Sequence, residues 1–509
     1  IDLNSRVMSI NLPTGLGKTL TSLAYALKLR KQIQLAKGYT PRIIYSLPFL
    51  SIIEQNAEQF ENVLIANGFD VDTSLLLKHH YLADVYYRKG QDEFESDDAK
   101  ILIEGWNAEI IVTTFVQLFH TIFSNKNRNL RKFHRLNGSI IILDEVQSIP
   151  THYWLLIGEM FKKLTQDLDV YVIFVTATEP LIFSRNEVTH LVNREFYFNN
   201  IERVTIIPRI DTSLTLEEFT ESLQLNDGKS YLFILNTIES AKAFYRFLER
   251  KTGENIVYLS THVVPYERLE RIRLMKERKI RLAVTTQVVE AGVDIDFDVV
   301  YRDLAPLDSI NQAAGRCNRN GMGKGHVIVV SLKDERRTYA SYIYDSVLLD
   351  ITKRILSDKE HIEEKEFLKI IEKYYAEVQV KKSTDISREL LSAVHKMKYE
   401  SVDGSTCIAD FKLIEQDYPK VDVFIELNEE AKQIWQRYDE IRKIEDKFER
   451  RLQFSRIKAD FYRYTVSVPM GINNIPPEVA GFRYVSTNVL NEYYDENTGF
   501  ITRGAMAIW

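Results

Sequence analysis

Cysteine is scarce in this sequence. Only Cys317 and Cys407 occur among its 509 residues. Two thiols cannot build a disulfide framework or a cysteine-rich metal site, and such low usage is typical of proteins kept in a reducing cytosol. We therefore expect a cytoplasmic protein that is stabilised by a buried core, for which an apolar content of 45% is ample.

Long apolar runs and an excess of positive charge are also missing. No apolar run approaches the roughly 18 residues that predict a membrane-spanning helix, so we expect no membrane association. The formal net charge is -6 at pH 7, which excludes a basic protein that coats nucleic acid through its overall charge. Any nucleic-acid site must therefore be a local groove.

The chain does contain a regular alternation of short apolar, β-rich runs with helical patterns such as Leu20–Gln32. Strands separated by helices predict parallel sheets with crossover helices. Two such series in tandem predict an α/β fold of two RecA-like parallel-sheet lobes. The expected strands are Val7–Asn11, Arg42–Leu47, Ile110–Thr114, Ser139–Leu143 and Val170–Thr176 in the first series, and Ser230–Leu235, Asn255–Ser260, Ile280–Thr285, Val299–Asp303 and His326–Leu332 in the second.

The pattern changes beyond the second series, where helices and charged residues become dense. One long charged helix is expected around Glu429–Tyr462, and the acidic segment Gln91–Lys100 is expected to be a solvated loop. The predicted parts are lobe 1 (1–205), lobe 2 (206–334), a helical linker (335–400) and a smaller α+β C-terminal domain (401–509).

The segment LPTGLGKT lies where an expected strand gives way to an expected helix, as in a phosphate-binding loop. Its glycines let the backbone approach phosphate groups, and the helix N-terminus faces their charge. Lys18 can reach the β- and γ-phosphates of ATP, and the Thr19 hydroxyl can bind Mg²⁺. Leu12 replaces the glycine of the strict pattern, so a turn without ligand is the alternative. The predicted ATP-binding residues here are Pro13, Thr14, Gly15, Leu16, Gly17, Lys18 and Thr19.

Two acidic residues, Asp144 and Glu145, follow the apolar strand Ser139–Leu143. The carboxyl ends of strands in such sheets face the ligand crevice. Asp144 can hold Mg²⁺ through water, and Glu145 can orient or deprotonate an attacking water. The alternative is an acidic helix N-cap after a strand.

A third group lies in the segment QAAGRCNR. If this segment is helical, Arg316 and Arg319 are one turn apart, and both can point at one γ-phosphate. An arginine there stabilises the charge of the phosphoryl-transfer transition state. The alternative is a basic surface helix, but Gly315 inside a helix costs about 1 kcal/mol relative to Ala. We predict that Gln312, Arg316 and Arg319 take part in catalysis.

Further segments begin at expected strand ends between these three groups. In order along the chain they resemble helicase motifs Ia, Ib, III, IV and V, placed correctly between motifs I, II and VI. The segments are Ser46–Gln55, Val112–Gln117, Thr176–Thr178, Leu235–Thr237 and Thr285–Asp294.

The chain thus resembles the superfamily 2 helicases and, within them, the CRISPR-associated helicase of type I interference systems. The closer resemblance rests on LPTGLGKT, LPFLSIIEQ, the DEVQ box, TQVVEAGVDIDFD and QAAGRCNRNG. The segments LLKHHYLAD and FKLIEQDYPKVDVFIE also agree. The resemblance covers residues 7–331 specifically and extends weakly to the C-terminus.

This resemblance implies an ATP- and Mg²⁺-dependent motor in prokaryotic antiviral defence. Members translocate along single-stranded DNA with 3′-to-5′ polarity after a guide-RNA surveillance complex opens the target. The resemblance also implies that Gly292 and Asp294 of motif V contact ATP. We read residues 401–509 as a cap over the DNA channel and a contact for a partner.

In most members an HD-type metal nuclease precedes the motor or is a separate chain. This sequence contains no His-Asp dipeptide. His79 and His80 lack acidic ligand partners at the usual spacing and are expected to pack or cap locally. We therefore expect no nuclease activity from this chain, and its start at Ile1 fits removal of the nuclease or its existence as a separate subunit. The adenine-contacting segment upstream of the phosphate loop is likewise expected to be truncated.

Motor lobes grip the sugar–phosphate backbone through backbone N–H groups and small hydroxyl side chains. For single positions, turn or cap chemistry is the alternative. The basic stretch Lys126–Arg135 contains no acid and is the better candidate for lining a groove, whereas Arg268–Arg281 is expected to be a salt-bridged exposed helix. The predicted DNA contacts are Pro48, Ser51, Thr113, Thr114, Asn236, Thr237, Thr285 and Thr286.

Two other functions stay open. The same lobes serve RNA helicases, and recognition of the 2′-hydroxyl decides between the two substrates. The C-terminal third also fits a recruitment module that uses the ATPase fold as a nucleotide-gated scaffold. In the leading hypothesis, Glu145 of one lobe and Arg316 and Arg319 of the other complete one hydrolysis site, so that lobe closure on ATP is coupled to stepping along DNA.

Overall fold

The computed structural model describes residues 1–80, 86–89, 92–95, 97–225, 228–290, 292–321, 323–414 and 418–502. Within helices and strands, the side chains of residues 50–52, 86, 92–95, 97, 98 and 100 lie outside this description. The chain forms two compact units, one of Ile1–Asn200 with Leu368–Glu415 and the other of Ile201–Phe367 with Gln416–Trp509.

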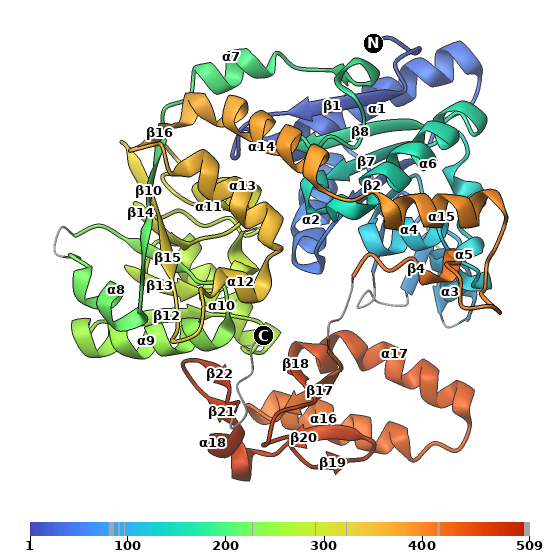
Figure 1. The fold of residues 1–509 in the computed structure, drawn as a ribbon. Helices are drawn as coiled ribbons and strands as arrows, with labels where there is room; N and C mark the ends of the chain where they lie inside the picture. The colour runs from blue at the N-terminus through green and yellow to red at the C-terminus, as the bar shows by residue number, and fades with distance from the viewer. Residues whose placement is uncertain are drawn as a thin grey trace. The chain divides into compact units, whose positions relative to one another are not determined.

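The first unit is built around a parallel sheet of seven described strands (Figure 1). Residues of its five central and longer strands are buried throughout, because helices cover both faces of a parallel sheet. Across the sheet the strands are β3 (Leu76–His79), β6 (Ile110–Thr114), β2 (Ile43–Leu47), β7 (Ile140–Asp144), β8 (Tyr171–Thr176), β1 (Val7–Asn11) and β9 (Thr189–His190).

The helices of the first unit come from two distant parts of the sequence. Those from the N-terminal part are α1 (Lys18–Lys37), α2 (Leu50–Ala66), α3 (Asp97–Glu104), α4 (Phe115–Ile122), α5 (Asn127–Leu130), α6 (Trp154–Asp167) and α7 (Arg194–Asn199). Two more, α14 (Phe367–Lys381) and α15 (Asp385–His395), follow the second lobe in the sequence.

The second unit contains another sheet of seven described strands, parallel except where β16 meets β10. Across the sheet they are β12 (Ile256–Leu259), β13 (Leu282–Thr285), β11 (Tyr231–Ile234), β14 (Val299–Asp303), β15 (Gly325–Leu332), β10 (Val204–Leu214) and β16 (Ile362–Glu363). The helices are α8 (Leu216–Ser222), α9 (Ile238–Thr252), α10 (Pro265–Lys276), α11 (Leu307–Ala314), α12 (Ala340–Ile343) and α13 (Ser346–Leu356).

All ten expected strands are confirmed within two residues at each end. The long strand β10 was not predicted, since Pro208 interrupts its apolar pattern, most of its later residues are partly exposed, and its register shifts between Arg209 and Ser213. The expected acidic loop Gln91–Lys100 is wrong where it is described: β5 (Asp92–Glu95) pairs with β4 (Tyr86–Lys89), and α3 begins at Asp97.

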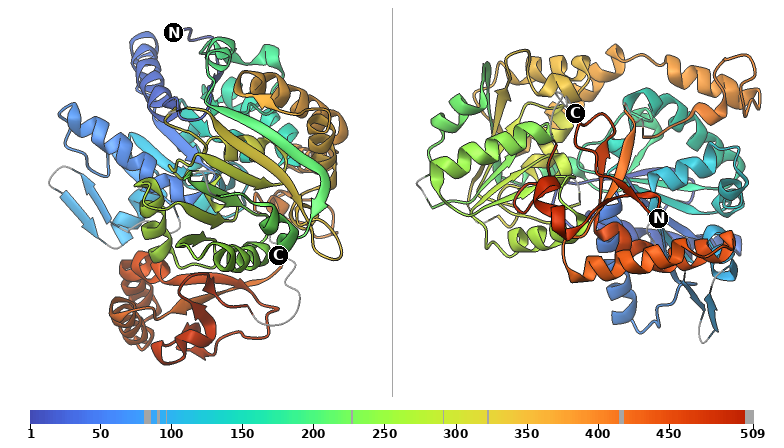
Figure 2. Two further views of the ribbon diagram at one scale, coloured as in Figure 1. Left: turned by 90° about the vertical axis from the view of Figure 1, so that its left-hand side faces the viewer. Right: turned by 90° about the horizontal axis from the view of Figure 1, so that it is seen from below.

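The C-terminal part of the second unit carries a small sheet of four described strands, β18 (Thr465–Pro469), β17 (Lys420–Ile425), β20 (Phe482–Val485) and β19 (Glu478–Val479). The expected single helix is wrong. It is two helices, α16 (Glu429–Arg442) and α17 (Lys447–Arg463), which lie side by side (Figure 2). The chain breaks between them because the Asp446 carboxylate caps α17, accepting from the amides of Phe448 at 2.6 Å and Glu449 at 3.1 Å.

A last hairpin fastens this C-terminal part to the second lobe. It consists of α18 (Leu490–Tyr493), β21 (Tyr494–Asp495) and β22 (Gly499–Phe500). The Tyr494 hydroxyl accepts from the Val264 amide at 3.1 Å, and the Arg271 guanidinium donates to the Asn497 carbonyl at 2.6 Å. A Cβ at Gly499 would lie 2.4 Å from the His262 carbonyl oxygen, so only glycine allows this approach.

The compact units group the four predicted parts differently from their order in the chain. Residues 335–400 were predicted as one linker. In the structure, the part up to Phe367 belongs to the second unit and the part from Leu368 belongs to the first. Before that point, β16 pairs with β10 of the second lobe. After it, the Ser387 hydroxyl accepts from the Leu156 amide at 3.1 Å, and Phe411 packs against Phe123 and Tyr153, which ties α15 and the segment after it to the first lobe.

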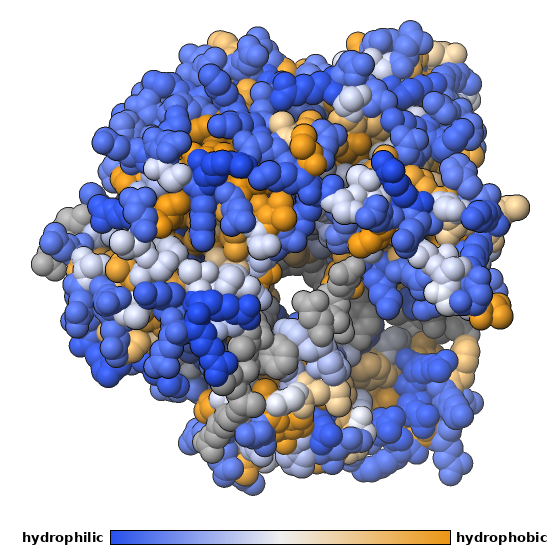
Figure 3. Space-filling model, viewed as in Figure 1, coloured by the Kyte–Doolittle hydropathy of each residue, from blue (hydrophilic) through white to orange (hydrophobic). Residues whose placement is uncertain are grey.

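The surface seen in Figure 3 is mainly hydrophilic, with separate small apolar patches. Among the described residues, no helix combines the length and the apolar character needed to cross a membrane.

Candidate nucleotide site and motor motifs

The predicted phosphate loop lies between the end of β1 at Asn11 and the start of α1 at Lys18. Gly15 and Gly17 take left-handed φ angles of 84° and 72°, which favour glycine. A Cβ at Gly17 would meet no heavy atom of the described residues within 4 Å, so this backbone borders open space. The first turn of α1 contains no acidic residue, and its positive end is left to attract an anion.

Leu12, the departure from the strict pattern, is part of the core and only 4% exposed. Its amide donates to the Thr176 carbonyl at 3.1 Å, which links the start of the loop to the end of β8. Pro13 is also buried, whereas Leu16 at the tip is 38% exposed. The loop is therefore anchored at its base and exposed at Gly15, Leu16 and Gly17, whereas Lys18 is buried at 9% exposure.

Asp144 ends β7 and is 4% exposed. The Tyr45 hydroxyl donates to its Oδ2 at 2.7 Å. Burial and the neighbouring Glu145 raise the pKa of Asp144 to about 7, while the Tyr45 hydrogen bond and the charge of Lys18 act in the opposite direction.

Glu145 has a left-handed backbone, with φ 55°. Such a conformation is uncommon for a non-glycine residue and is often found at functional sites. Within the described residues, its side chain makes no capping hydrogen bond to the following short helix, which disfavours the N-cap alternative. Gln147 instead donates to the Glu145 carboxylate.

Gln147 and Tyr45 are the functional-site residues that sequence reasoning did not single out. The Gln147 Oε1 accepts from the Thr176 hydroxyl at 2.6 Å, and the Thr178 amide donates to that hydroxyl at 2.9 Å. Gln147 therefore connects motif II to motif III. Its place in the DEVQ box was the available signal, whereas nothing in the local pattern around Tyr45 pointed to Asp144.

Thr19 and Asp144 offer a hydroxyl and a carboxylate, the oxygen ligands that Mg²⁺ prefers. Among the described residues, no group of three or more His, Cys, Asp or Glu is arranged to hold a metal ion. In a phosphate-loop magnesium site, substrate phosphates and waters supply most ligands, so two protein oxygens suffice. The Thr19 hydroxyl and the Asp144 carboxylate therefore fit a magnesium ion.

The predicted catalytic residues of motif VI lie beyond the end of a helix. Helix α11 ends at Ala314, and Gly315 is its C-cap with φ -66°, so the expectation that Gly315 lies inside a helix and that Arg316 and Arg319 are one helical turn apart is wrong. Gln312 is half-buried on α11. Arg316 is 7% exposed, and its guanidinium donates to the carbonyls of Val289 at 2.8 Å and Glu290 at 2.7 Å.

Arg319 is more exposed than Arg316 and forms an ion pair of 2.8 Å with Asp294. Lys276 lies 3.9 Å from the same carboxylate. Gly292, with φ 73°, makes the turn before Asp294. The structure thus places the predicted residues Gly292, Asp294 and Arg319 together at the end of motif V.

Most of the predicted DNA contacts have side chains that are occupied inside the protein. Thr114 caps α4 and Thr237 caps α9, while the Thr113 hydroxyl donates to the His79 carbonyl and that of Thr285 to the Thr286 carbonyl. Turn and cap chemistry therefore accounts for these hydroxyls. Thr286 is buried, Pro48 is half-buried, and the side chain of Ser51 lies outside the described residues. Their contact with DNA stays a prediction.

The two basic stretches differ from each other in the way that their charges are paired. Arg128 and Arg131 of Lys126–Arg135 both pair with Glu104, at 3.0 and 3.9 Å. Lys132 is 1% exposed, donates to Gln117, and has its pKa lowered to about 8 by burial. The assumption that this stretch has no compensating acid is wrong, because the acid comes from α3.

The other stretch, Arg268–Arg281, is mainly the salt-bridged helix that was expected. Arg271 pairs with Glu267 at 3.0 Å, and Arg273 with Glu270 at 2.6 Å. These pairs, three or four residues apart, are typical of a helix surface.

His79 packs in the core and accepts from Trp106 Nε1 at 3.1 Å, as the expectation of local packing required. Burial lowers its pKa to about 3. His80 has an acidic neighbour after all, since it lies 3.0 Å from Glu54 of α2. Glu54 is distant from His80 in the sequence, so no local motif indicated this contact.

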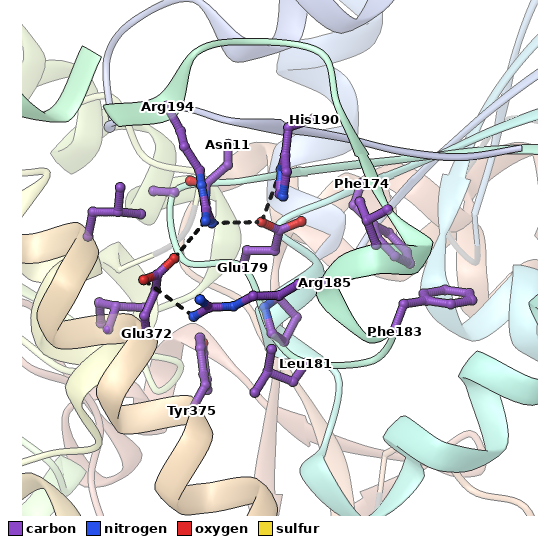
Figure 4. Close-up of a pocket in the computed structure, with 15 residues that line it drawn as sticks. Asn11, Phe174, Glu179, Leu181, Phe183, Arg185, His190, Arg194, Glu372 and Tyr375 are labelled. Atoms are coloured by element: carbon purple, nitrogen blue, oxygen red, sulfur yellow. Dashed lines mark hydrogen bonds and ion pairs between the residues drawn. The ribbon is translucent and has the colours of Figure 1, made fainter. Parts of the chain in front are cut away.

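A small pocket behind the phosphate loop joins the first lobe to α14 (Figure 4). Arg194 lies between two carboxylates, 3.5 Å from Glu179 and 2.8 Å from Glu372, and Arg185 pairs with Glu372 at 3.3 Å. The space left is about 20 Å³, enough for roughly one water molecule. This pocket is therefore too small for a nucleotide, and its ion pairs connect α14 to residues 179–194 of the first lobe.

Two family models match the chain. The model described as DEAD/DEAH box helicase matches residues 2–183, and the model described as CRISPR-associated nuclease/helicase Cas3, C-terminal, matches residues 227–322. Together they cover the regions that hold motifs I to III and IV to VI.

Among similar proteins, the CRISPR-associated nuclease/helicase Cas3 of Haloferax volcanii is 31% identical over 441 residues, which cover 64% of this chain and 46% of that protein. The chain therefore spans less than half the length of this relative.

Solved structures with the same fold include T. fusca Cas3-ATP, with a TM-score of 0.67 and 18% identity over 98% of this chain and 69% of that chain. A chain of a CRISPR RNA-guided surveillance complex, pre-nicking, has a TM-score of 0.62 and 16% identity over 98% of this chain and 68% of that one.

Proposed function

We propose that this chain is a Cas3-like helicase that hydrolyses ATP to translocate along single-stranded DNA in CRISPR interference, which the two family models and the Haloferax volcanii relative support. We further propose a 3′-to-5′ direction, the cytoplasm of a prokaryote as its location, and a guide-RNA surveillance complex as its partner. An HD nuclease supplied by another segment or subunit would cut the strand that the motor moves.

The observation that carries this proposal is the arrangement at the carboxyl ends of β1 and β7. The first strand opens into a loop with two left-handed glycines, and the second ends at the buried Asp144 and the left-handed Glu145. The positive charge of Lys18 acts to lower the pKa of Asp144, against the effect of burial.

Each residue has a role in this proposal. The amides of the loop and of the first turn of α1 bind the phosphates, and Lys18 neutralises their charge. Thr19 and Asp144 would hold Mg²⁺, which draws negative charge from the β- and γ-phosphates when bound. Glu145, held by Gln147, orients the attacking water and accepts its proton.

The residues of motif VI complete the proposed chemistry. Arg316 and Arg319 stabilise the charge of the transferring phosphate, and Gln312 assists them. Gly292 and Asp294, next to Arg319, respond to the nucleotide. The DNA strand is held through backbone groups of the segments that contain Pro48, Ser51, Thr113, Thr114, Asn236, Thr237, Thr285 and Thr286.

The test is ATPase activity with and without a single-stranded DNA oligomer. Glu145→Gln should lower turnover by about 10²-fold or more while nucleotide binding persists, because general-base catalysis contributes roughly that factor. Glu159→Gln on α6, whose carboxylate pairs only with a surface lysine in the described contacts, is the matched control and should keep full activity.

If DNA does not stimulate ATP hydrolysis, or if Glu145→Gln keeps full ATPase activity, the proposal is wrong. Equal stimulation by an RNA oligomer of the same sequence would favour an RNA helicase, since the 2′-hydroxyl distinguishes the two. Nucleotide binding without hydrolysis would favour a nucleotide-gated scaffold.

A further inference from the structure

Arg302, on β14 of the second unit, is 0% exposed and belongs to no helicase motif. A fully buried guanidinium must be paired and hydrogen-bonded to be tolerated. Its Nε lies 2.7 Å from Glu290 Oε1, its Nη1 donates to Asn236 Oδ1 at 2.6 Å, and its Nη2 donates to the Tyr344 hydroxyl at 2.8 Å.

These partners come from separate motifs. Asn236 belongs to motif IV and Glu290 to motif V, while Tyr344 follows α12. Glu290 is 6% exposed and also accepts from the Ser309 hydroxyl at 3.0 Å. Its carboxylate is therefore held on two sides by contacts that reach well beyond its own segment.

The Asn236 side chain is saturated by this cluster. Its Nδ2 donates to Asp303 Oδ2 at 2.7 Å and to the Leu304 carbonyl at 2.8 Å, and its Oδ1 is the acceptor used by Arg302. Gln287 of motif V donates to the Asn236 carbonyl at 2.8 Å and to the Tyr344 hydroxyl at 3.2 Å. Motifs IV and V are thus joined through side chains and backbone around one arginine.

The segment held in this way is the one that holds Arg316. The Arg316 guanidinium donates to two backbone carbonyls of motif V, those of Val289 and Glu290. Thr285 and Thr286, predicted to meet DNA, lie at the start of the same segment. A shift of residues 285–290 would therefore move the acceptors that orient Arg316.

We propose that Arg302 is a positioning residue, which fixes the segment 285–290 and through it the guanidinium of Arg316, so that nucleic acid bound at this segment raises the rate of phosphate transfer. This inference rests on the proposed function, since it assigns the route by which DNA stimulates hydrolysis. A buried polar cluster held by several hydrogen bonds and one ion pair suits this role, because packed networks have few alternative arrangements.

The test uses Arg302→Lys, which keeps the charge but cannot reach three acceptors at once, and Tyr344→Phe, which removes one hydroxyl. Both should lower the DNA-stimulated turnover about tenfold and leave the KM for ATP unchanged, since no phosphate-loop contact is altered. Arg281→Lys, at a half-buried ion pair of 2.5 Å with Glu254, and Tyr245→Phe are matched controls in the same unit and should keep normal turnover.

A double-mutant cycle separates positioning from simple destabilisation. In an Arg316→Ala background, Arg302→Lys should cause no further loss, because a residue that acts through another loses its effect when that residue is removed. An equal loss in both backgrounds, or a loss that disappears at lower temperature along with partial unfolding, would overturn the assignment.

The outcomes also distinguish the two proposals. Normal DNA stimulation in Arg302→Lys and Tyr344→Phe would overturn this inference and leave the proposed function standing. Absence of stimulation in the unchanged chain would overturn the proposed function and this inference together.

Discussion

Leu12 stands where the strict phosphate-loop pattern has glycine, and its environment explains how the loop can keep its shape. The side chain is packed in the core, and the left-handed angles that the loop needs are supplied by Gly15 and Gly17. Position 12 itself needs no glycine here, because its side chain has a place in the apolar core.

Leu12→Ala should therefore lower the free energy of unfolding by about 2–5 kcal/mol, the usual effect of removing a buried leucine side chain. Nucleotide affinity of the folded protein should change little. Chemical denaturation measures the first quantity and nucleotide titration the second. Leu20→Ala on α1, where the leucine is 46% exposed, should change stability by less than about 0.5 kcal/mol; an equal loss in both variants would contradict the anchoring role.

His79 gives a pH dependence of stability. Burial holds its pKa at about 3 in the folded protein, whereas the usual value is 6.5. Between these values the unfolded state binds more protons, so the free energy of unfolding should fall as pH drops from about 6.5 towards 3, by up to about 1.4 kcal/mol per pH unit.

His79→Asn keeps an acceptor for Trp106 but does not titrate in this range. Denaturation curves measured from pH 7 to 4 should have a smaller pH slope for this variant than for the unchanged protein. His134→Asn, at an exposed position, should keep the original slope. Identical slopes in all three proteins would show that His79 is not the group responsible.

At the scale of elements, the segment 368–415 follows the second lobe in the sequence but packs as part of the first unit. Helix α14 meets the lobe through the Arg194–Glu372 pair and through Tyr375, whose ring packs edge-on against Trp154. The far end is held by Phe411, which is 2% exposed and packs against Phe123 and Tyr153.

Phe411→Ala should lower the free energy of unfolding of the first unit by about 3–5 kcal/mol, as expected for removing a buried phenylalanine. Ile414→Ala is the control, because Ile414 is 64% exposed on the same segment. Hydrogen exchange of α15, followed by mass spectrometry, should accelerate in the first variant only. Unchanged protection of α15 in Phe411→Ala would contradict the view that this ring anchors the segment 368–415 to the first lobe.

At the scale of the whole molecule, the C-terminal part is joined to the second lobe by a few specific contacts. Arg271 makes several of them at once, donating to the carbonyls of Tyr258, Glu496 and Asn497 at 2.6–2.8 Å and pairing with Glu267. Its neighbour Arg273 pairs only with exposed acids of its own helix in the described contacts.

Arg271→Ala should lower the free energy of unfolding by about 1.5–3 kcal/mol, since three carbonyls, of which only that of Tyr258 is partly buried, lose a charged donor. Arg273→Ala on the same helix should cost less than about 1 kcal/mol, as is usual for exposed ion pairs. Thermal unfolding of the full chain compares the two. Equal midpoints would mean that the hairpin is held mainly by its apolar contacts.

The local pattern predicted the parts of the fold that depend on neighbours in sequence. Strands such as Ile110–Thr114 and Val299–Asp303 were placed correctly because a strand buried on both faces is a short apolar run. The phosphate loop and the acidic pair at the end of β7 were located by their residue types and their position after a strand. The break at Asp446 and the end of α11 at Ala314 were missed, because caps and helix ends depend on single side chains and turns.

The sequence by itself determined the two α/β lobes and the order of the motifs, and it predicted the roles of Lys18, Asp144 and Glu145, since each depends on a few consecutive residues. Only the tertiary structure decided which distant residues meet. Glu104 pairs with two arginines of the basic stretch that looked unpaired, and the segment that begins at Leu368 returns to the first lobe. Arg302 contacts residues of both motif IV and motif V. Contacts of this kind join residues far apart in the chain and leave no periodic signal, because burial and pairing arise only when the chain is folded.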